Sequence, residues 1–360
     1  MIGGWACVCF AHSYATLLVG RAMTGFCSGV ISVAIPGYVW DITTPNRKRF
    51  FGITFQIMIC AGELYLACFG SMLDWNQLAY VAIVPTIICS LGMWLAAPNT
   101  PVRHLIDDNP ALARKSLLML RASESDVDGE LQELQARIHE TQLNRQILRF
   151  SLLTRRDVLI PSLIVVLLMG SQQFSGVNTF LFNLRYIFEG IGANINSNIA
   201  VVIIDGAHLG ATIHTSFIVD KFGCKMLLLI SGIGQIIALL MIGVYYRWIH
   251  PGDTWIPVAC LMLFIVMFSV GFGPIPWMIT GELVSHEAIP LVSSLVSGTN
   301  WTSTFIITET FNPLTSLLHK YGVYWLFAGF STCSVFFTLF FLPETKGRTI
   351  EEIQRYFNGK

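Results

Sequence analysis

Apolar runs of about 20 residues recur along this 360-residue chain, and this feature restricts its fold more than any other. A helix of that length spans the roughly 30 Å hydrocarbon core of a bilayer. Only 12% of the residues are charged, about half the share of a soluble domain. The sequence therefore predicts an all-α membrane protein with ten spans, at approximately 1–12, 15–40, 51–73, 77–97, 158–188, 195–219, 226–247, 255–283, 291–317 and 322–342.

The composition changes between the fourth and the fifth span. Residues 103–157 hold nine basic and nine acidic side chains, which is 18 of the 44 charges in the chain. Leucines at helical spacing among these charges predict amphipathic helices outside the bilayer. We therefore expect an N-terminal transmembrane lobe over 1–97, a cytosolic helical connector over 98–157, a six-helix lobe over 158–342 and a cytosolic tail over 343–360.

The distribution of lysine and arginine predicts the orientation of the chain. One set of loops is basic, with residues 47–49, the connector, Lys221, Lys225 and the tail, whereas the opposite loops hold few cations. Basic loops remain in the cytoplasm. We therefore expect a multi-pass protein of the cell membrane with both termini in the cytoplasm. In the tail, Pro343 ends the last span, and the spacing of Thr349 and Glu352 predicts the capped start of a short helix.

Several classes of function are disfavoured by composition and motifs. The net charge is zero, which gives no basic footprint for nucleic acid. The nine cysteines lie mostly in apolar runs and form no CxxC pair, so we expect no metal site. Neither HExxH nor GxSxG is present. We expect no cofactor and no enzymatic activity.

Several segments, in order along the chain, resemble signatures of the sugar porter family of the major facilitator superfamily. Among members of this family, the segments GFGPIPWMITGE and FEGIG are most similar to those of insect facilitated trehalose transporters. The segments are GRAMTGFCSG (20–29), PGYVWDITTPNRKR (36–49), PNTPVRHLI (98–106), QQFSGVN (172–178), VDKFGCK (219–225), GFGPIPW (271–277) with GTNW (298–301), and PETKGR (343–348).

The resemblance implies a twelve-helix bundle with cytosolic helices between its two lobes. Aligned in this way, the chain begins at the third helix of the family. We therefore expect an incomplete N-terminal lobe that lacks the first two helices.

A sugar site needs neutral donors and acceptors for hydroxyl groups and aromatic faces for C–H patches, because charges are costly at mid-membrane. The resemblance assigns this role to Gln172, Gln173, Asn178, His208, Trp277 and Asn300, with Trp301 as a neighbouring or gating aromatic residue. The alternative is structural: the amides bond to adjacent helices and the indoles pack or lie at an interface.

Two further sets of residues relate to conformational change. The expected span 255–283 contains two glycines and two prolines, which predict a weakened helix and a hinge. These residues are Gly271, Gly273, Pro274 and Pro276. The resemblance also implies a cytoplasmic charge network that holds one state, formed by Asp41, Arg47, Arg49, Asp220, Lys221, Lys225, Glu282 and Glu344.

The resemblance implies facilitated transport of a sugar, either trehalose or a hexose such as glucose, with the sugar and the lipid bilayer as partners. The alternative is a non-transporting sugar sensor or a decayed, truncated transporter homologue. Asp205 lies three residues before His208, on the same helical face. This pair suggests either a proton-linked step or a locally paired Asp–His.

Overall fold

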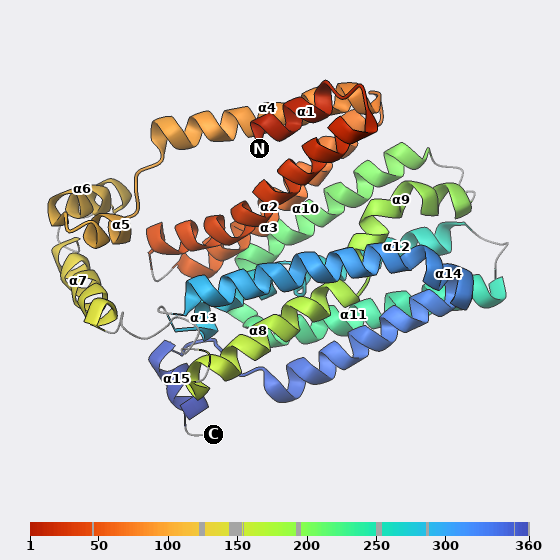
Figure 1. The fold of residues 1–360 in the computed structure, drawn as a ribbon. Helices are drawn as coiled ribbons and strands as arrows, with labels where there is room; N and C mark the ends of the chain where they lie inside the picture. The colour runs from red at the N-terminus through yellow and green to blue at the C-terminus, as the bar shows by residue number, and fades with distance from the viewer. Residues whose placement is uncertain are drawn as a thin grey trace.

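The structure, a computed structural model, is built of helices (Figure 1). It describes residues 1–44, 47–121, 127–143, 153, 155–191, 196–249, 254–285, 288–348 and 350–358. The first helix group packs by contacts of α1 with α2 and α4, and of α3 with α2 and α4. Its members are α1 (Ile2–Cys9), α2 (Tyr14–Ile42), α3 (Lys48–Gly70) and α4 (Trp75–Ala96).

In the second helix group, two spans are interrupted, α8–α9 and α12–α13, and α14 is a pair of helices joined at a kink. Its members are α8 (Arg156–Phe174), α9 (Val177–Ile191), α10 (Ser197–Phe222), α11 (Cys224–Val244), the π-helical turn η5 (Tyr245–Ile249), α12 (Trp255–Val270), α13 (Ile275–Leu283) and α14 (Ile289–Phe341). α14 has 53 residues, but His319 within it has non-helical backbone angles (φ 57°, ψ 168°). It is therefore two consecutive helices that meet at His319.

Eight helical stretches of the described residues are long and apolar enough to cross a bilayer, and the last of them, Ile289–Phe341, is long enough for two crossings. Nine of the ten expected spans therefore have a counterpart among these residues. The expected span 1–12 differs, because α1 has only eight residues. At 1.5 Å per residue, α1 covers about 12 Å, which is less than half of the hydrocarbon core.

The charged segment forms short helices outside the two groups, as its pattern predicted. These are α5 (Pro101–Ile106), α6 (Pro110–Leu120) and α7 (Val127–Leu143). Thr100 and Asn109 cap α5 and α6, and each helix begins with a proline. Arg121 joins α7 by an ion pair with Glu130 and donates to the carbonyl of Ile42, which ties the segment to α2.

The tail helix α15 (Ile350–Asn358) lies at the same end of the bundle as α5–α7, and we call this the connector end (Figure 1). α15 contacts α8 and α13. The capping interaction expected at Thr349 lies outside the described residues.

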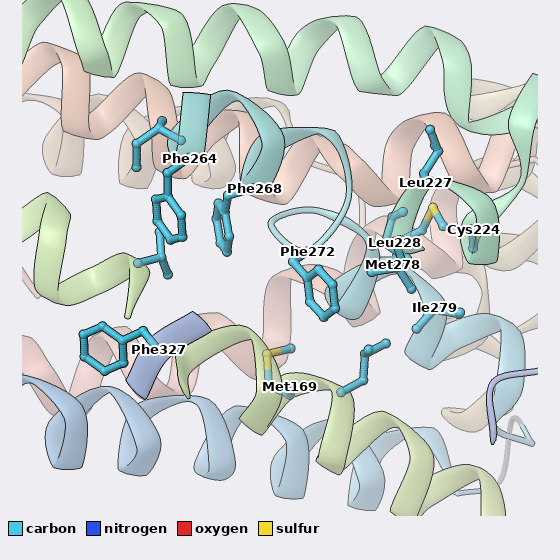
Figure 2. Packing of buried hydrophobic residues seen from close by; sticks show 14 of the residues in the cluster. Met169, Cys224, Leu227, Leu228, Phe264, Phe268, Phe272, Met278, Ile279 and Phe327 are labelled. Atoms are coloured by element: carbon cyan, nitrogen blue, oxygen red, sulfur yellow. The ribbon is translucent and has the colours of Figure 1, made fainter. Parts of the chain in front are cut away.

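The two helix groups meet along α3 with α10, α2 with α14, and α13 with both α2 and α3. The continuous apolar core belongs mainly to the second group (Figure 2). In Figure 2, Phe268 of α12, Phe272 of the following loop and Met278 of α13 succeed one another along one interrupted span. This core holds the breaks in the helices at which the candidate site is built.

Candidate functional site

The break between α8 and α9 depends on Gly176. Its φ is +86°, a left-handed conformation that favours glycine. A Cβ atom there would lie 2.6 Å from the ring of Phe327, so the backbone also needs the space. Ser175 stabilises the turn by donating from its hydroxyl to the carbonyl of Gln172, at 2.7 Å. The turn returns Asn178 to the side chain of Gln173, at 2.5 Å between Nδ2 and Oε1.

The second break lies between α12 and α13, at the glycines and prolines that the sequence singled out. A Cβ atom on Gly271 would lie 2.6 Å from the carbonyl oxygen of Leu227, so only glycine allows this approach to α11. Pro274 and Pro276 lie at the start of α13. The amide of Phe272 donates to the hydroxyl of Ser231, at 3.1 Å. Side chains of neighbouring helices therefore satisfy backbone groups that the helix leaves open.

Gln172 is the centre of a hydrogen-bonded cluster and is 2% exposed. Its Nε2 donates to the carbonyls of Phe272 and Gly273, both at 2.7 Å. Its Oε1 accepts from Gln173 and Asn300, both at 3.1 Å. An amide side chain has two donor hydrogens and two acceptor lone pairs, so Gln172 is fully used. It joins α8 and α14 to the break in the α12–α13 span.

The other three amides keep some bonding capacity. Asn178 donates from Nδ2 to Gln173 and, at 3.1 Å, to Thr304, whereas Asn300 donates to Gln172 and to the sulfur of Met169. Among the residues that the structure describes, no donor bonds to Oδ1 of Asn178 or Asn300. We call Gln172, Gln173, Asn178 and Asn300 the amide network; its open atoms are acceptors for hydroxyl groups.

The two tryptophans lie apart from each other. Trp277 is half-buried on α13 and packs against Phe55 of α3, with ring centroids 4.9 Å apart. Trp301 on α14 is 48% exposed, and its Nε1 donates to Ser32 of α2 at 3.2 Å. Both indoles therefore bridge the two helix groups.

His208 lies away from the amide network. It is 1% exposed on α10, and its Nδ1 is 3.3 Å from Oε2 of Glu63 on α3. Its ring also packs at the edge of Phe268, with centroids 6.0 Å apart. Glu63 is absent from the residues expected in the site, although an ionisable residue inside the apolar run 51–73 is a visible signal in the sequence.

One ion pair of the expected charge network joins the two helix groups. Nε of Arg49 on α3 lies 2.5 Å from Oε1 of Glu282 on α13. Arg49 also donates from Nη2 to the carbonyl of Thr345 in the tail, at 2.9 Å. Asp220, at the end of α10, adds its charge to the electrostatic surroundings of Arg49.

Lys225, Glu344 and Lys221 make contacts within the second helix group and the tail. Lys225 donates to the carbonyls of Leu339 and Leu342 at the end of α14, both at 2.8 Å. The carboxylate of Glu344 lies over Gly223, where a Cβ atom would approach Oε1 to 2.9 Å, so it faces the start of α11. Lys221 accepts at its carbonyl from Lys346. Asp41 lies at the end of α2, and Arg47 is the residue before α3.

A cavity of about 460 Å³ lies farther along the second helix group, away from the connector end. It is lined by polar and aromatic side chains of α9, η5 and α14, among them Asn183, Tyr186, Tyr246, Asn312, Lys320 and Tyr324. The amide network does not line this cavity. The amides and the open cavity are therefore separate features of the same helices.

Comparisons with known proteins agree with this architecture. The family model "Sugar (and other) transporter" matches residues 1–357. Facilitated trehalose transporter Tret1 of Polypedilum vanderplanki is 32% identical over 365 residues, covering all of this chain and 72% of the relative. Its namesake in Bombyx mori is 33% identical, covering 98% of this chain and 70% of the relative. The Drosophila yakuba protein of that name is 32% identical over 97% of this chain, which spans 41% of the relative.

The solved structures show the same fold. The proton:xylose symporter XylE bound to 6-bromo-6-deoxy-D-glucose superposes with a TM-score of 0.82 at 20% identity, covering 99% of this chain and 80% of the symporter. An inward open conformation of the xylose transporter XylE from E. coli gives a TM-score of 0.73 at 18% identity, with 99% and 79% covered.

Proposed function

This chain belongs to the sugar (and other) transporter family, and on that premise we propose that it carries a sugar across the cell membrane by alternating access. The sugar moves down its gradient and is not chemically changed. Trehalose, the substrate in the names of the relatives, and hexoses are the candidates. The amide network carries this proposal, because it places neutral acceptors beside the α8–α9 break and joins them through Gln172 to the α12–α13 break.

We assign sugar contact to Asn178, Asn300 and Gln173, whose bonding capacity is not used up. Oδ1 of each asparagine accepts a sugar hydroxyl, and the face of Trp277 covers an apolar C–H patch. Gln172 positions these groups rather than binding the sugar itself, since all its hydrogen-bonding positions are used. A neutral site suits an uncharged polyol, because a charged side chain at this depth is costly.

The movement that we propose is a rocking of the first helix group, residues 1–97, against the second, residues 158–342. The glycines and prolines of the α12–α13 break act as a hinge, because side chains hold part of the backbone there in place of regular helical bonds. The Arg49–Glu282 ion pair holds the connector end closed. It must break when the sugar is released on that side.

Uptake of radiolabelled trehalose and glucose into oocytes tests the site. We expect Asn300→Ala to raise the KM about tenfold, which corresponds to about 1.4 kcal/mol for one lost hydrogen bond. Thr299→Ala is the matched control, because among the described residues the Thr299 hydroxyl bonds only to its own helix, at the carbonyl of Leu295. Unchanged uptake in both Asn300→Ala and Asn178→Ala would remove the amide network as the site. Binding of sugar without uptake would favour a sensor.

We also propose that the connector end, with the tail helix α15, faces the cytoplasm; the N-terminal end differs from the expectation, because α1 covers only about 12 Å and does not return it to the connector end. The basic residues Lys221, Lys225, Lys346 and Arg348 gather at this end, as the positive-inside rule requires. An epitope tag placed after α15 should bind antibody only after the cells are permeabilised. Labelling of intact cells would reverse the orientation.

A further inference from the structure

Three potential metal ligands meet where α3 packs against α10. Cys60 and Glu63 on α3 and His208 on α10 each offer one ligand atom, and these atoms all lie within 4.8 Å of one another. The shortest separation joins Nδ1 of His208 to Oε2 of Glu63, at 3.3 Å. The cluster is distinct from the amide network, which is formed by α8, α9 and α14.

The polar atoms of the cluster are buried without hydrogen bonds. Both ring nitrogens of His208, which is 1% exposed, and Oε2 of Glu63 have no hydrogen-bond partner among the described residues. The 3.3 Å contact between them lacks hydrogen-bond geometry. A buried polar group left in this condition costs about 1–3 kcal/mol. Lone pairs that converge in an apolar region indicate a site for a cation.

Asp205 brings a second carboxylate to the same place. It lies one helical turn before His208, is 6% exposed, and interacts electrostatically with both Glu63 and His208. Two carboxylates near one imidazole leave an excess of negative charge, which is costly in the interior of a membrane protein. A divalent cation would compensate this charge.

We propose that Cys60, Glu63 and His208 bind a thiophilic divalent cation of the Zn²⁺ class, with Asp205 or a water molecule in the fourth position. Sulfur, imidazole nitrogen and carboxylate oxygen are the ligands that zinc takes. Tetrahedral bonds of about 2.0–2.3 Å place ligand atoms roughly 3.3–3.8 Å apart, so small side-chain rotations close this cluster. Binding releases the thiol proton, so the thiolate, the two carboxylates and the cation together carry a formal charge of about −1, compared with about −2 before binding.

One polar neighbour of Cys60 supports a thiolate at this position. Nε2 of Gln56 donates to Sγ of Cys60 at 3.7 Å. Oγ1 of Thr212 also lies 3.6 Å from the sulfur, but its hydroxyl donates to the carbonyl of His208. A donor such as Gln56 orients a metal-binding sulfur and stabilises its charge.

A cation in this site joins the first helix group to the second, because its ligands come from α3 and α10. If the groups rock against each other, a bound cation holds one arrangement and stops transport. Inhibition by zinc is therefore the functional consequence, and it rests on the transport function proposed above. The binding itself does not depend on that function.

Titration of the purified, metal-stripped protein with Co²⁺ tests the binding. We expect one Co²⁺ per chain, with a thiolate-to-cobalt absorption band that Zn²⁺ removes. Cys60→Ser should abolish the band, and Glu63→Gln should weaken affinity at least tenfold. Cys68→Ser is the matched control, since Cys68 lies on α3 but is exposed. Absence of the band in the unsubstituted protein, or its persistence in Cys60→Ser, would overturn the proposal.

Sugar uptake in the presence of Zn²⁺ tests the consequence. Cys60→Ser should keep the basal uptake and lose at least tenfold in zinc sensitivity, whereas Cys68→Ser should be inhibited like the unsubstituted protein. If metal binds but uptake is not inhibited, the bound cation does not hold the two helix groups in one arrangement. If the cobalt band is intact but the protein takes up no sugar, the proposed transport function is wrong and the metal site stands. If the cobalt band is missing and Glu63→Gln abolishes the pH dependence of uptake, the cluster binds protons rather than a metal ion, and the metal site is wrong.

Discussion

The guanidinium of Arg49 on α3 and the carboxylate of Glu282 on α13 form an ion pair across the two helix groups, with both side chains largely buried. The helices are close on either side of it. A Cβ atom on Gly52 would lie 2.7 Å from Met278, and one on Gly281 would lie 2.9 Å from the ring of Trp40. The connector end is therefore closed by an ion pair set within tight helix packing.

Replacing Arg49 with alanine should loosen this closed end. The change leaves Glu282 buried without its cation, so we expect the free energy of unfolding to fall by about 1–3 kcal/mol. Cys224 supplies an internal reporter, because its sulfur is buried 4.0 Å from Glu282. We expect maleimide to label Cys224 several-fold faster in Arg49→Ala, as measured by mass spectrometry of the Cys224 peptide.

Arg103→Ala is the control for this experiment. Arg103 also pairs with a carboxylate, Asp107, but its side chain is 66% exposed. An exposed pair contributes less than about 1 kcal/mol, so neither stability nor Cys224 labelling should change appreciably. If Arg49→Ala and Arg103→Ala gave the same labelling rate, the Arg49–Glu282 pair would have no role in closure.

Gly176→Ala should destabilise the protein through two separate effects. An alanine in the left-handed backbone conformation of residue 176 lowers the stability by about 1–2 kcal/mol. Its Cβ atom would also displace the ring of Phe327, which would lie 2.6 Å from it. We expect a lower melting temperature of the purified protein. Adding Phe327→Leu to Gly176→Ala should recover only part of the loss, because the backbone strain remains.

Gly329→Ala serves as the comparison for Gly176→Ala. Gly329 lies in α14, where an added Cβ atom would meet no atom of the described residues within 4 Å, and alanine is the better helix former. Its melting temperature should stay equal or rise. Equal melting temperatures for the two alanine variants would contradict the structural role of Gly176.

The sequence predicted those features that depend on local pattern. The apolar runs located nine spans, and the charges of 103–157 located the helices α5–α7. GFGPIPW predicted a weakened helix, and the structure interrupts the span there, with Pro274 and Pro276 at the start of α13 and Gly271 close to Leu227. Local composition is enough for such predictions, since a helix and its breaks are set by neighbouring residues.

Features that depend on tertiary packing could not be predicted from local sequence patterns. Cys60 and Glu63 lie far along the chain from His208, so cysteine spacing predicted no metal site. Likewise, nothing in QQFSGVN distinguishes Gln172 from Gln173. Only the packing of α8 against the α12–α13 break shows that Gln172 bonds to two backbone carbonyls. The two glutamines of the motif therefore have different roles.

This difference between the glutamines predicts different consequences of substitution. Gln172→Leu removes the donors to the carbonyls of Phe272 and Gly273 and leaves both buried, so we expect the free energy of unfolding to fall by about 3 kcal/mol. Asn178→Ala removes a half-buried side chain that, in the described part of the chain, bonds only to Gln173 and Thr304. It should change stability by less than about 1 kcal/mol while it raises the KM for sugar.

Thermal unfolding of the purified variants, measured together with sugar uptake at several concentrations, separates the two roles. A positioning residue loses stability and maximal rate together when it is removed, because the break that it holds no longer has one geometry. A residue that contacts sugar loses apparent affinity in an otherwise stable protein. Should Gln172→Leu melt like the unsubstituted chain and differ only in KM, Gln172 would itself contact the sugar, and its bonds to the break would be replaceable by water.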